Sequence, residues 1–228
     1  MKGSRNAEVQ AGPPLVLLAS PLARGATYGA TAAALARHFR VFTVEYPDIR
    51  RTRGWTVNEY AARTAAELVD LGLPRPILVG HSYTGGVAVL VAARHPESVG
   101  RLVVADAIGT GPHSVGRAVA GMAHDSVREG DIVAERWPDT FGQFVRSPRQ
   151  FLRLARESLT LDVREEASRV KVPTLVAWGR MDRTVHPRNA AEFARVMPHA
   201  RVYLSERGGH AWPVTQPGEF AALLSAAG

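Results

Sequence analysis

The chain has 228 residues, of which 46% are hydrophobic, which is enough for one sizeable core in a single domain. It contains no cysteine, so disulfides, thiolate nucleophiles and cysteine-ligated metal sites are excluded. The net charge of +7 comes from arginines that are interleaved with acidic residues, a pattern typical of a solvated surface and not of nucleic-acid binding. No apolar run reaches membrane-spanning length, so we expect a cytoplasmic protein without nucleic-acid or membrane partners. Its oligomeric state is left open.

Strands and helices alternate through the first half of the chain. In order, the hydrophobic patterns predict a strand at 15–19, a helix at 27–38, a strand at 40–45, a helix at 56–71, a strand at 76–79, a helix at 87–94 and a strand at 101–105. This alternation favours a mostly parallel sheet with helices on both faces.

The alternation stops between residues 110 and 169, where no strand pattern is found. Helical patterns occur at 113–125, 126–137 and 148–159. We interpret 110–169 as a small helical cap inserted into a core made of 1–109 and 170–228. Such a cap would exclude water and shape a pocket. The candidate lining residues are Met122, Trp137, Phe141 and Phe144, although residues of these types also pack helices onto cores.

After the cap, strands are predicted at 174–177 and 202–204, and a last helix follows. Only fourteen residues precede Leu15, too few for an additional hairpin, so we expect about six strands in total.

The turn between the strand at 76–79 and the helix at 87–94 contains Ser82. The segment Gly80-His81-Ser82-Tyr83-Thr84-Gly85 leaves room only for a tight elbow. Such an elbow strains the backbone at the serine and lifts its hydroxyl clear of the sheet, at the positive end of a helix. Ser82 is therefore a candidate nucleophile, and we expect His81 to be structural.

A carboxylate and an imidazole follow two later strands. Asp182 comes after Trp178-Gly179, and His210 comes after Gly208-Gly209. Because the carboxyl ends of parallel strands meet at one edge, both side chains can reach Ser82. The imidazole would take the serine proton and the carboxylate would orient the ring. Asp106, at the end of another strand, is the rival for the acid, although a strand-end aspartate is commonly a cap.

The order Ser82, Asp182, His210 resembles that of the α/β-hydrolase superfamily. Further similar motifs are His95-Pro96, Val172-Pro173-Thr174-Leu175, Trp178-Gly179-x-x-Asp182, Gly209-His210 and Gln216-Pro217, so that the resemblance covers nearly the whole chain. It implies the α/β-hydrolase fold, with the nucleophile strand beside the strand at 15–19. It also implies a serine hydrolase that acts on a small carboxylic ester, lactone or thioester through an acyl-enzyme, with no cofactor.

Two positions depart from the superfamily pattern. Thr84 stands where a glycine is usual, and Ser20-Pro21 replaces a His-Gly pair, loosely as in the enol-lactonases. The resemblance implies an oxyanion hole made by the backbone N–H groups of Leu22 and Tyr83, since Pro21 has none.

Other functions remain open at this level. The same triad in related folds cleaves carbon–carbon bonds or runs lyase or cyclase reactions, and the two departures also allow a weakly active small-molecule receptor. The remaining histidines have no partner at metal-ligand spacing, so no metal site is expected.

Overall fold

The structure is a computed structural model that describes residues 12–22, 25–130 and 140–227. Six parallel strands form one sheet in the order β2-β1-β3-β4-β5-β6. They are β1 (Pro14–Leu18), β2 (Arg40–Val44), β3 (Ile77–His81), β4 (Arg101–Ala105), β5 (Thr174–Gly179) and β6 (Ala200–Ser205). The predicted parallel sheet of about six strands is confirmed, including the position of β3 beside β1.

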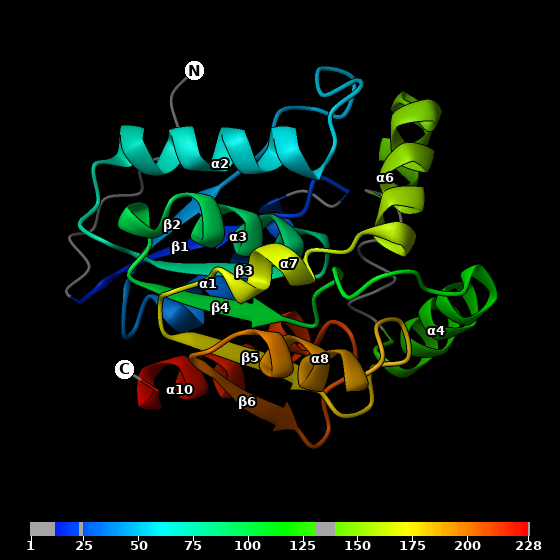
Figure 1. Cartoon of the computed structure of the whole chain (residues 1–228). Coiled ribbons are helices and arrows are strands. Elements are labelled where there is room, and N and C mark those ends of the chain that lie inside the picture. The colour runs from blue at the N-terminus through cyan, green and yellow to red at the C-terminus, as the bar shows by residue number, and fades with distance from the viewer. Residues whose placement is uncertain (1–11, 23–24, 131–139, 228) are drawn as a thin grey trace.

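Helices cover both faces of the sheet (Figure 1). One face carries α2 (Val57–Leu71), α3 (Tyr83–Arg94), α7 (Arg164–Ser168) and α8 (Arg188–Val196). The other carries α1 (Gly29–Leu35) and α10 (Pro217–Ala226), with the short α9 (Trp212–Thr215) beside them. Two 3-10 turns, η1 (Gly25–Tyr28) and η2 (Pro96–Ser98), complete the core.

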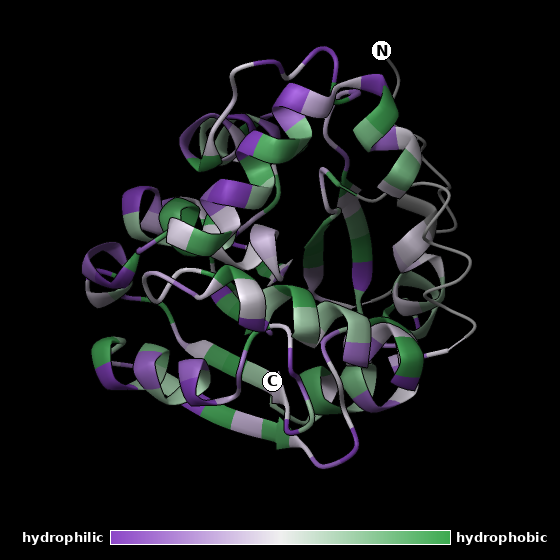
Figure 2. Ribbon diagram, turned by 90° about the vertical axis from the view of Figure 1, so that its right-hand side faces the viewer, coloured by the Kyte–Doolittle hydropathy of each residue, from purple (hydrophilic) through white to green (hydrophobic). Residues whose placement is uncertain are grey.

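Side chains of each strand alternate between two hydrophobic clusters. On β1, Val16 and Leu18 pack under the α2–α3 layer, whereas Leu15 and Leu17 pack under α1 and α10. Figure 2 shows the hydrophobic residues concentrated on the inner strands and on the inward faces of the helices. A strand buried on both faces reads as a continuous apolar run, which is why these strands were predictable.

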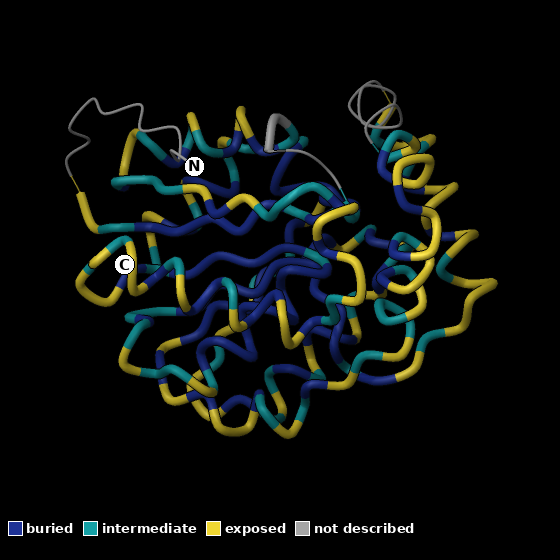
Figure 3. Tube along the Cα trace, turned by 90° about the horizontal axis from the view of Figure 1, so that it is seen from above, coloured by how far each residue is buried: buried dark blue, intermediate teal, exposed yellow. Residues whose placement is uncertain are grey.

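The segment between β4 and β5 projects beyond the carboxyl ends of the strands. It contains α4 (Val115–Arg128), a helical stretch at 140–146 and α6 (Pro148–Thr160). An antiparallel bridge between Thr110 and Asp162 closes its base. Figure 3 shows this segment as largely exposed, in contrast with the buried strands. Within the predicted cap, α7 packs on α3 and α8 and thus lies in a helical layer of the core.

Polar side chains of α6 attach it to the core. Gln150 accepts a hydrogen bond from the N–H of Gly54 and donates one to the carbonyl of Trp55, both at 2.9 Å. Glu157 accepts from the N–H of Val57, at the start of α2, and from the hydroxyl of Tyr83. None of the helices in the described part of the chain is long and apolar enough to cross a membrane.

Candidate active site

Ser82 forms the turn between β3 and α3. Its backbone has φ 55° and ψ −122°, a conformation that costs a non-glycine residue on the order of 1–3 kcal/mol. The neighbouring backbone holds it there. The N–H of Ser82 donates to the carbonyl of Ala105 at 3.0 Å, and its own carbonyl accepts from the N–H of Gly85 at 3.0 Å. This strained turn therefore places the serine side chain at the carboxyl edge of the sheet.

Two glycines allow this elbow to close. A Cβ on Gly80 would lie 2.2 Å from the carbonyl oxygen of Thr84, and one on Gly85 would lie 2.3 Å from the Cβ of Ala107. Both separations are shorter than any ordinary contact, so no side chain fits at either position.

Thr84, the departure from the usual glycine, is fully buried and bonded within the elbow. Its hydroxyl accepts from the N–H of His81 at 3.1 Å and lies 2.9 Å from the carbonyl of His81. The same hydroxyl lies 3.3 Å from the carbonyl of Leu18, at the end of β1. The threonine thus links the elbow to the loop that follows β1.

The structure brings Ser82, His210 and Asp182 into one hydrogen-bonded chain. Nε2 of His210 lies 3.0 Å from Oγ of Ser82, and Nδ1 lies 2.9 Å from Oδ2 of Asp182. The other oxygen of Asp182 accepts from the N–H of Val185 at 2.7 Å. Because the carboxylate can only accept, Nδ1 carries the proton and Nε2 is free to take one from the serine.

Close backbone contacts place the acid loop against the histidine loop. A Cβ on Gly179 would lie 2.3 Å from the carbonyl oxygen of Gly209, and the N–H of Met181 donates to the carbonyl of Gly208 at 2.8 Å. Gly179 of the Trp-Gly motif is therefore required where these two loops cross.

Asp106 lies at the end of β4, next to the acid but outside this chain of bonds. It is fully buried, has φ 43°, and its Oδ1 accepts from the N–H of Gly179 at 2.8 Å. Burial, and then the negative charge of Asp182, raise the pKa of Asp106 well above its usual range. We interpret Asp106 as a neutral carboxylic acid that ties β4 to β5.

The pKa of His210 is set by opposing effects. Burial lowers it, but the charge and hydrogen bond of Asp182, with smaller contributions from Glu129 and Asp125, outweigh burial and raise the pKa above the ordinary histidine value. The imidazolium that would form during catalysis is therefore stabilised.

His81 supports His210 from the other side. Its ring is buried, with Nε2 2.8 Å from the carbonyl oxygen of His210 and Nδ1 2.8 Å from the hydroxyl of Tyr28. Since the carbonyl can only accept, Nε2 donates and Nδ1 accepts from the tyrosine. The structural role expected for His81 is thus a specific one, because it links the elbow to the histidine loop.

Asp125 on α4 and Glu129, the residue that follows this helix, bind the loops that carry Asp182 and His210. Asp125 accepts from the N–H groups of Arg183 and Thr184 and from the hydroxyl of Thr184. Glu129 accepts from the N–H of Ala211 at 2.9 Å. Sequence reasoning missed both residues, because nothing local marks either acid as the partner of loops 58 to 82 residues away.

The two residues expected to form an oxyanion hole lie at the start of α3 and in the loop that follows β1. Tyr83 is the first residue of α3, where no preceding turn of the helix exists to accept its N–H. The N–H of Leu22 donates to Oγ of Ser20 at 3.2 Å. As an oxyanion-hole donor, the N–H of Leu22 would donate to the oxyanion either together with Ser20 or in place of Ser20.

The residues predicted to line a pocket are less buried than that role suggests. Met122 is 49%, Phe141 62% and Phe144 37% exposed, and Trp137 lies outside the described residues. Phe144 packs against Phe141 and edge-on against Phe151. They remain a prediction. Within the described ranges, no group of three or more histidine and acidic side chains could hold a metal ion.

Comparison with known proteins places the chain in a family. A model of the alpha/beta hydrolase family matches residues 15–223. The pimeloyl-[acyl-carrier protein] methyl ester esterase of Vibrio cholerae is 24% identical over 244 residues, which cover 93% of each chain. The 2-hydroxymuconate semialdehyde hydrolase of Pseudomonas putida is 27% identical over 179 residues, which cover 68% of this chain and 62% of that one. The crystal structure of the enol-lactonase from Burkholderia xenovorans LB400 has a TM-score of 0.73 at 21% identity and covers 98% of this chain and 93% of its own. Because the family model spans nearly all of the sheet and its helices, the chain belongs to the alpha/beta hydrolase family.

Proposed function

We propose that this protein is a serine hydrolase that cleaves a small-molecule carboxylic ester, lactone or thioester through an acyl-enzyme on Ser82. The observation that carries the proposal is the continuous chain of bonds from Oγ of Ser82 through His210 to Asp182. The proposal is supported because the candidate nucleophile, a base with a free nitrogen and an orienting carboxylate lie within hydrogen-bond reach of one another.

In the acylation step, Nε2 of His210 takes the proton of Ser82 as Oγ attacks the substrate carbonyl carbon. The imidazolium keeps its Nδ1–H bond to Asp182, which stabilises the positive charge. The N–H groups of Tyr83 and Leu22 are the proposed donors to the oxyanion. When the tetrahedral intermediate collapses, His210 returns the proton to the leaving alkoxide, enolate or thiolate.

In the deacylation step, His210 removes a proton from water, which attacks the acyl carbon, and then returns the proton to Ser82. Protein side chains carry every proton in this cycle. The bonds of His81 to His210 and of Glu129 to Ala211 hold the imidazole in place through both steps.

The relatives support the substrate class without naming the substrate. The Vibrio cholerae relative is named for a methyl ester and the Pseudomonas putida relative for a semialdehyde. The enol-lactonase supports only the fold. We further propose that residues 110–169 form a cap over the site, that Met122, Trp137, Phe141 and Phe144 contact the substrate when the cap closes, and that the enzyme acts in the cytoplasm.

Thr84 gives no support to a receptor function. Its side chain is bonded inside the elbow, so the departure from glycine preserves the serine geometry. Carbon–carbon bond cleavage and lyase or cyclase reactions use the same triad, and they are separated from ester hydrolysis by the substrate panel below.

The test is activity-based labelling followed by a substrate panel. We expect a fluorophosphonate to label Ser82 rapidly, and the Ser82→Ala variant to lose both labelling and turnover of esters, lactones or thioesters. Ser98→Ala, in η2 beyond the carboxyl end of α3, is the matched control and should behave as the wild type. An unlabelled wild-type protein that nevertheless binds small molecules tightly would contradict the proposal and favour a receptor. Turnover of a vinylogous diketone, without any ester activity, would favour carbon–carbon cleavage.

A further inference from the structure

A cavity lies between α4 and the segment that follows Asp182. Its volume is about 620 Å³, within the range of small-molecule sites. The lining residues come from α4, from the loop before it, and from the segment that leads into the first turn of α8. They are Pro112, His113, Ser114, Arg117, Ala118, Ala120, Gly121, His124, Arg183, Thr184, His186, Arg188 and Asn189. Ser82, His210, Leu22 and Tyr83 are not among the lining residues, so this cavity is separate from the candidate active site.

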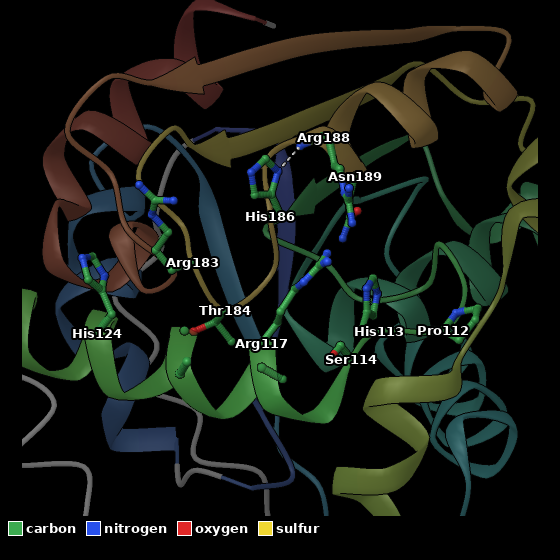
Figure 4. Close-up of a pocket in the computed structure, with 13 residues that line it drawn as sticks. Pro112, His113, Ser114, Arg117, His124, Arg183, Thr184, His186, Arg188 and Asn189 are labelled. Atoms are coloured by element: carbon green, nitrogen blue, oxygen red, sulfur yellow. Dashed lines mark hydrogen bonds between the residues drawn. The ribbon is translucent and has the colours of Figure 1, made fainter.

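The charged side chains that line this cavity are all arginines. Arg117, Arg183 and Arg188 line it together with three histidines, and no carboxylate is among the described residues that line it. Figure 4 shows Arg117 reaching from α4 toward Asn189 on α8, with His113 and His186 on either side. None of the three guanidinium groups makes an ion pair with another residue of the described part of the chain.

The nearest carboxylates are already engaged. Asp125 is bonded to the backbone of Arg183 and to Thr184, and Asp182 is bonded to His210 and Val185. Glu192, further along α8, pairs with Arg164 and Arg195. His124 lies 3.2 Å from Asp125, but the guanidinium groups of Arg117, Arg183 and Arg188 have no ion pair with a carboxylate of the described residues.

Two of the residues that line the cavity also carry buried nitrogens without a hydrogen-bond partner. Asn189 is only 5% exposed, and its Nδ2 has no hydrogen-bond partner. Nε2 of His113 is likewise buried without a partner. A buried donor without an acceptor costs about 1–3 kcal/mol, which a ligand acceptor would recover.

Helix ends add to this field. The cavity lies at the amino-terminal ends of α4 and α8, which carry partial positive charge, and the α4 cap residue Ser114 makes no side-chain capping bond. Planar guanidinium groups bind phosphate and carboxylate oxygens in pairs.

We propose that this cavity is a binding site for a small, multiply charged oxyanion, in particular a phosphate-bearing molecule, held by Arg117, Arg188 and Asn189. Its volume exceeds that of a phosphate ion, so the anionic group would belong to a larger ligand. The site adjoins the segment that begins one residue after Asp182, so a bound anion would also order the acid loop.

The test is thermal unfolding of the whole protein in increasing pyrophosphate, with sodium chloride at matched ionic strength as the reference. We expect a saturating rise in Tm of about 3–6 °C at ten times the dissociation constant. Phenyl phosphate should act in the same way and citrate more weakly if phosphate is preferred. An equal effect of chloride, or no saturation, would overturn the proposal.

Variants connect the effect to this cavity. Arg117→Ala and Arg188→Ala should each abolish most of the stabilisation, whereas Arg37→Ala, an exposed arginine outside the cavity, should retain it. Asn189→Asp should prevent pyrophosphate binding, because it places a carboxylate where the ligand would lie. Undiminished stabilisation in all three cavity variants would refute the assignment, whatever the outcome for hydrolase activity.

The histidines provide an independent readout. Burial and then Arg188 lower the pKa of His113, and burial and the neighbouring arginines Arg188, Arg183 and Arg117 lower that of His186 against the opposing effect of Asp182. A bound anion favours the charged rings, so both pKa values should rise when pyrophosphate is added, as followed by NMR titration. Unchanged imidazole titrations at saturating pyrophosphate would contradict the site.

Discussion

Replacing Asp182 by asparagine tests the acid assignment most directly. In the structure Oδ1 of Asp182 accepts from the N–H of Val185 at 2.7 Å, and Oδ2 accepts from Nδ1 of His210 at 2.9 Å. The asparagine oxygen would keep the bond to Val185, so its NH₂ group would face Nδ1. The histidine would then carry its proton on Nε2 and could no longer accept the proton of Ser82.

We expect Asp182→Asn to lower kcat by roughly 10⁴-fold, the loss measured when an orienting aspartate is replaced in another triad enzyme. That ratio corresponds to about 5.4 kcal/mol of lost transition-state stabilisation at 1.36 kcal/mol per factor of ten. The fold should survive, because the substitution preserves volume and the bond to Val185. The assay is the steady-state hydrolysis of an activated ester or of the substrate found in the panel, with circular dichroism to check folding.

Asp106→Asn is the matched control. Asp106 is a neutral acid in our interpretation, and an asparagine keeps its bond from Gly179, so no charge is lost. We expect kcat to stay within about a factor of ten of the wild type, or 1.4 kcal/mol. A loss in Asp106→Asn as large as in Asp182→Asn, or a loss below tenfold in Asp182→Asn, would refute the reasoning.

Three further predictions concern pH, cooperation and packing. His210 must be neutral to act as a base and its pKa is raised, so kcat/KM should fall on acidification with an apparent pKa above about 6.5. Glu129→Gln should lower this apparent pKa, because it removes a nearby negative charge. An unchanged acidic limb of the pH profile would show that His210 does not feel the charge of Glu129. Ser82→Ala and His210→Ala should each remove nearly all turnover, with the double variant scarcely worse in single-turnover assays; additive losses would contradict a triad. Gly80→Ala should destabilise the protein by about 1–3 kcal/mol in denaturant titrations, because its Cβ would meet the backbone of Thr84, whereas Gly218→Ala, with open space around it, should not.

Much of the fold could be predicted because its signals are local. Strands β1 to β5 carry apolar runs that a local pattern identifies. The predicted bounds of β4 match the structure. The edge strand β6 begins at Ala200, two residues earlier than predicted. The prediction missed this start because Arg201 and Val202 are exposed and the apolar pattern is weak there. The predicted helix at 27–38 is shorter, since the chain forms a 3-10 turn before Gly29 and leaves the helix after Leu35.

The sequence by itself determined where the chemical groups stand along the chain: Ser82 in a strand-to-helix turn, and Asp182 and His210 each after a strand. Each of these positions follows from residues within a few places of it. Only the tertiary structure decided that Asp182, and not Asp106, contacts His210, because both acids end buried neighbouring strands and the choice depends on where the histidine loop crosses Gly179. It also decided the contacts of His81, Asp125 and Glu129, whose partners are 53 to 129 residues away. Contacts at such separations depend on how whole elements pack, and no short pattern in the chain encodes that packing.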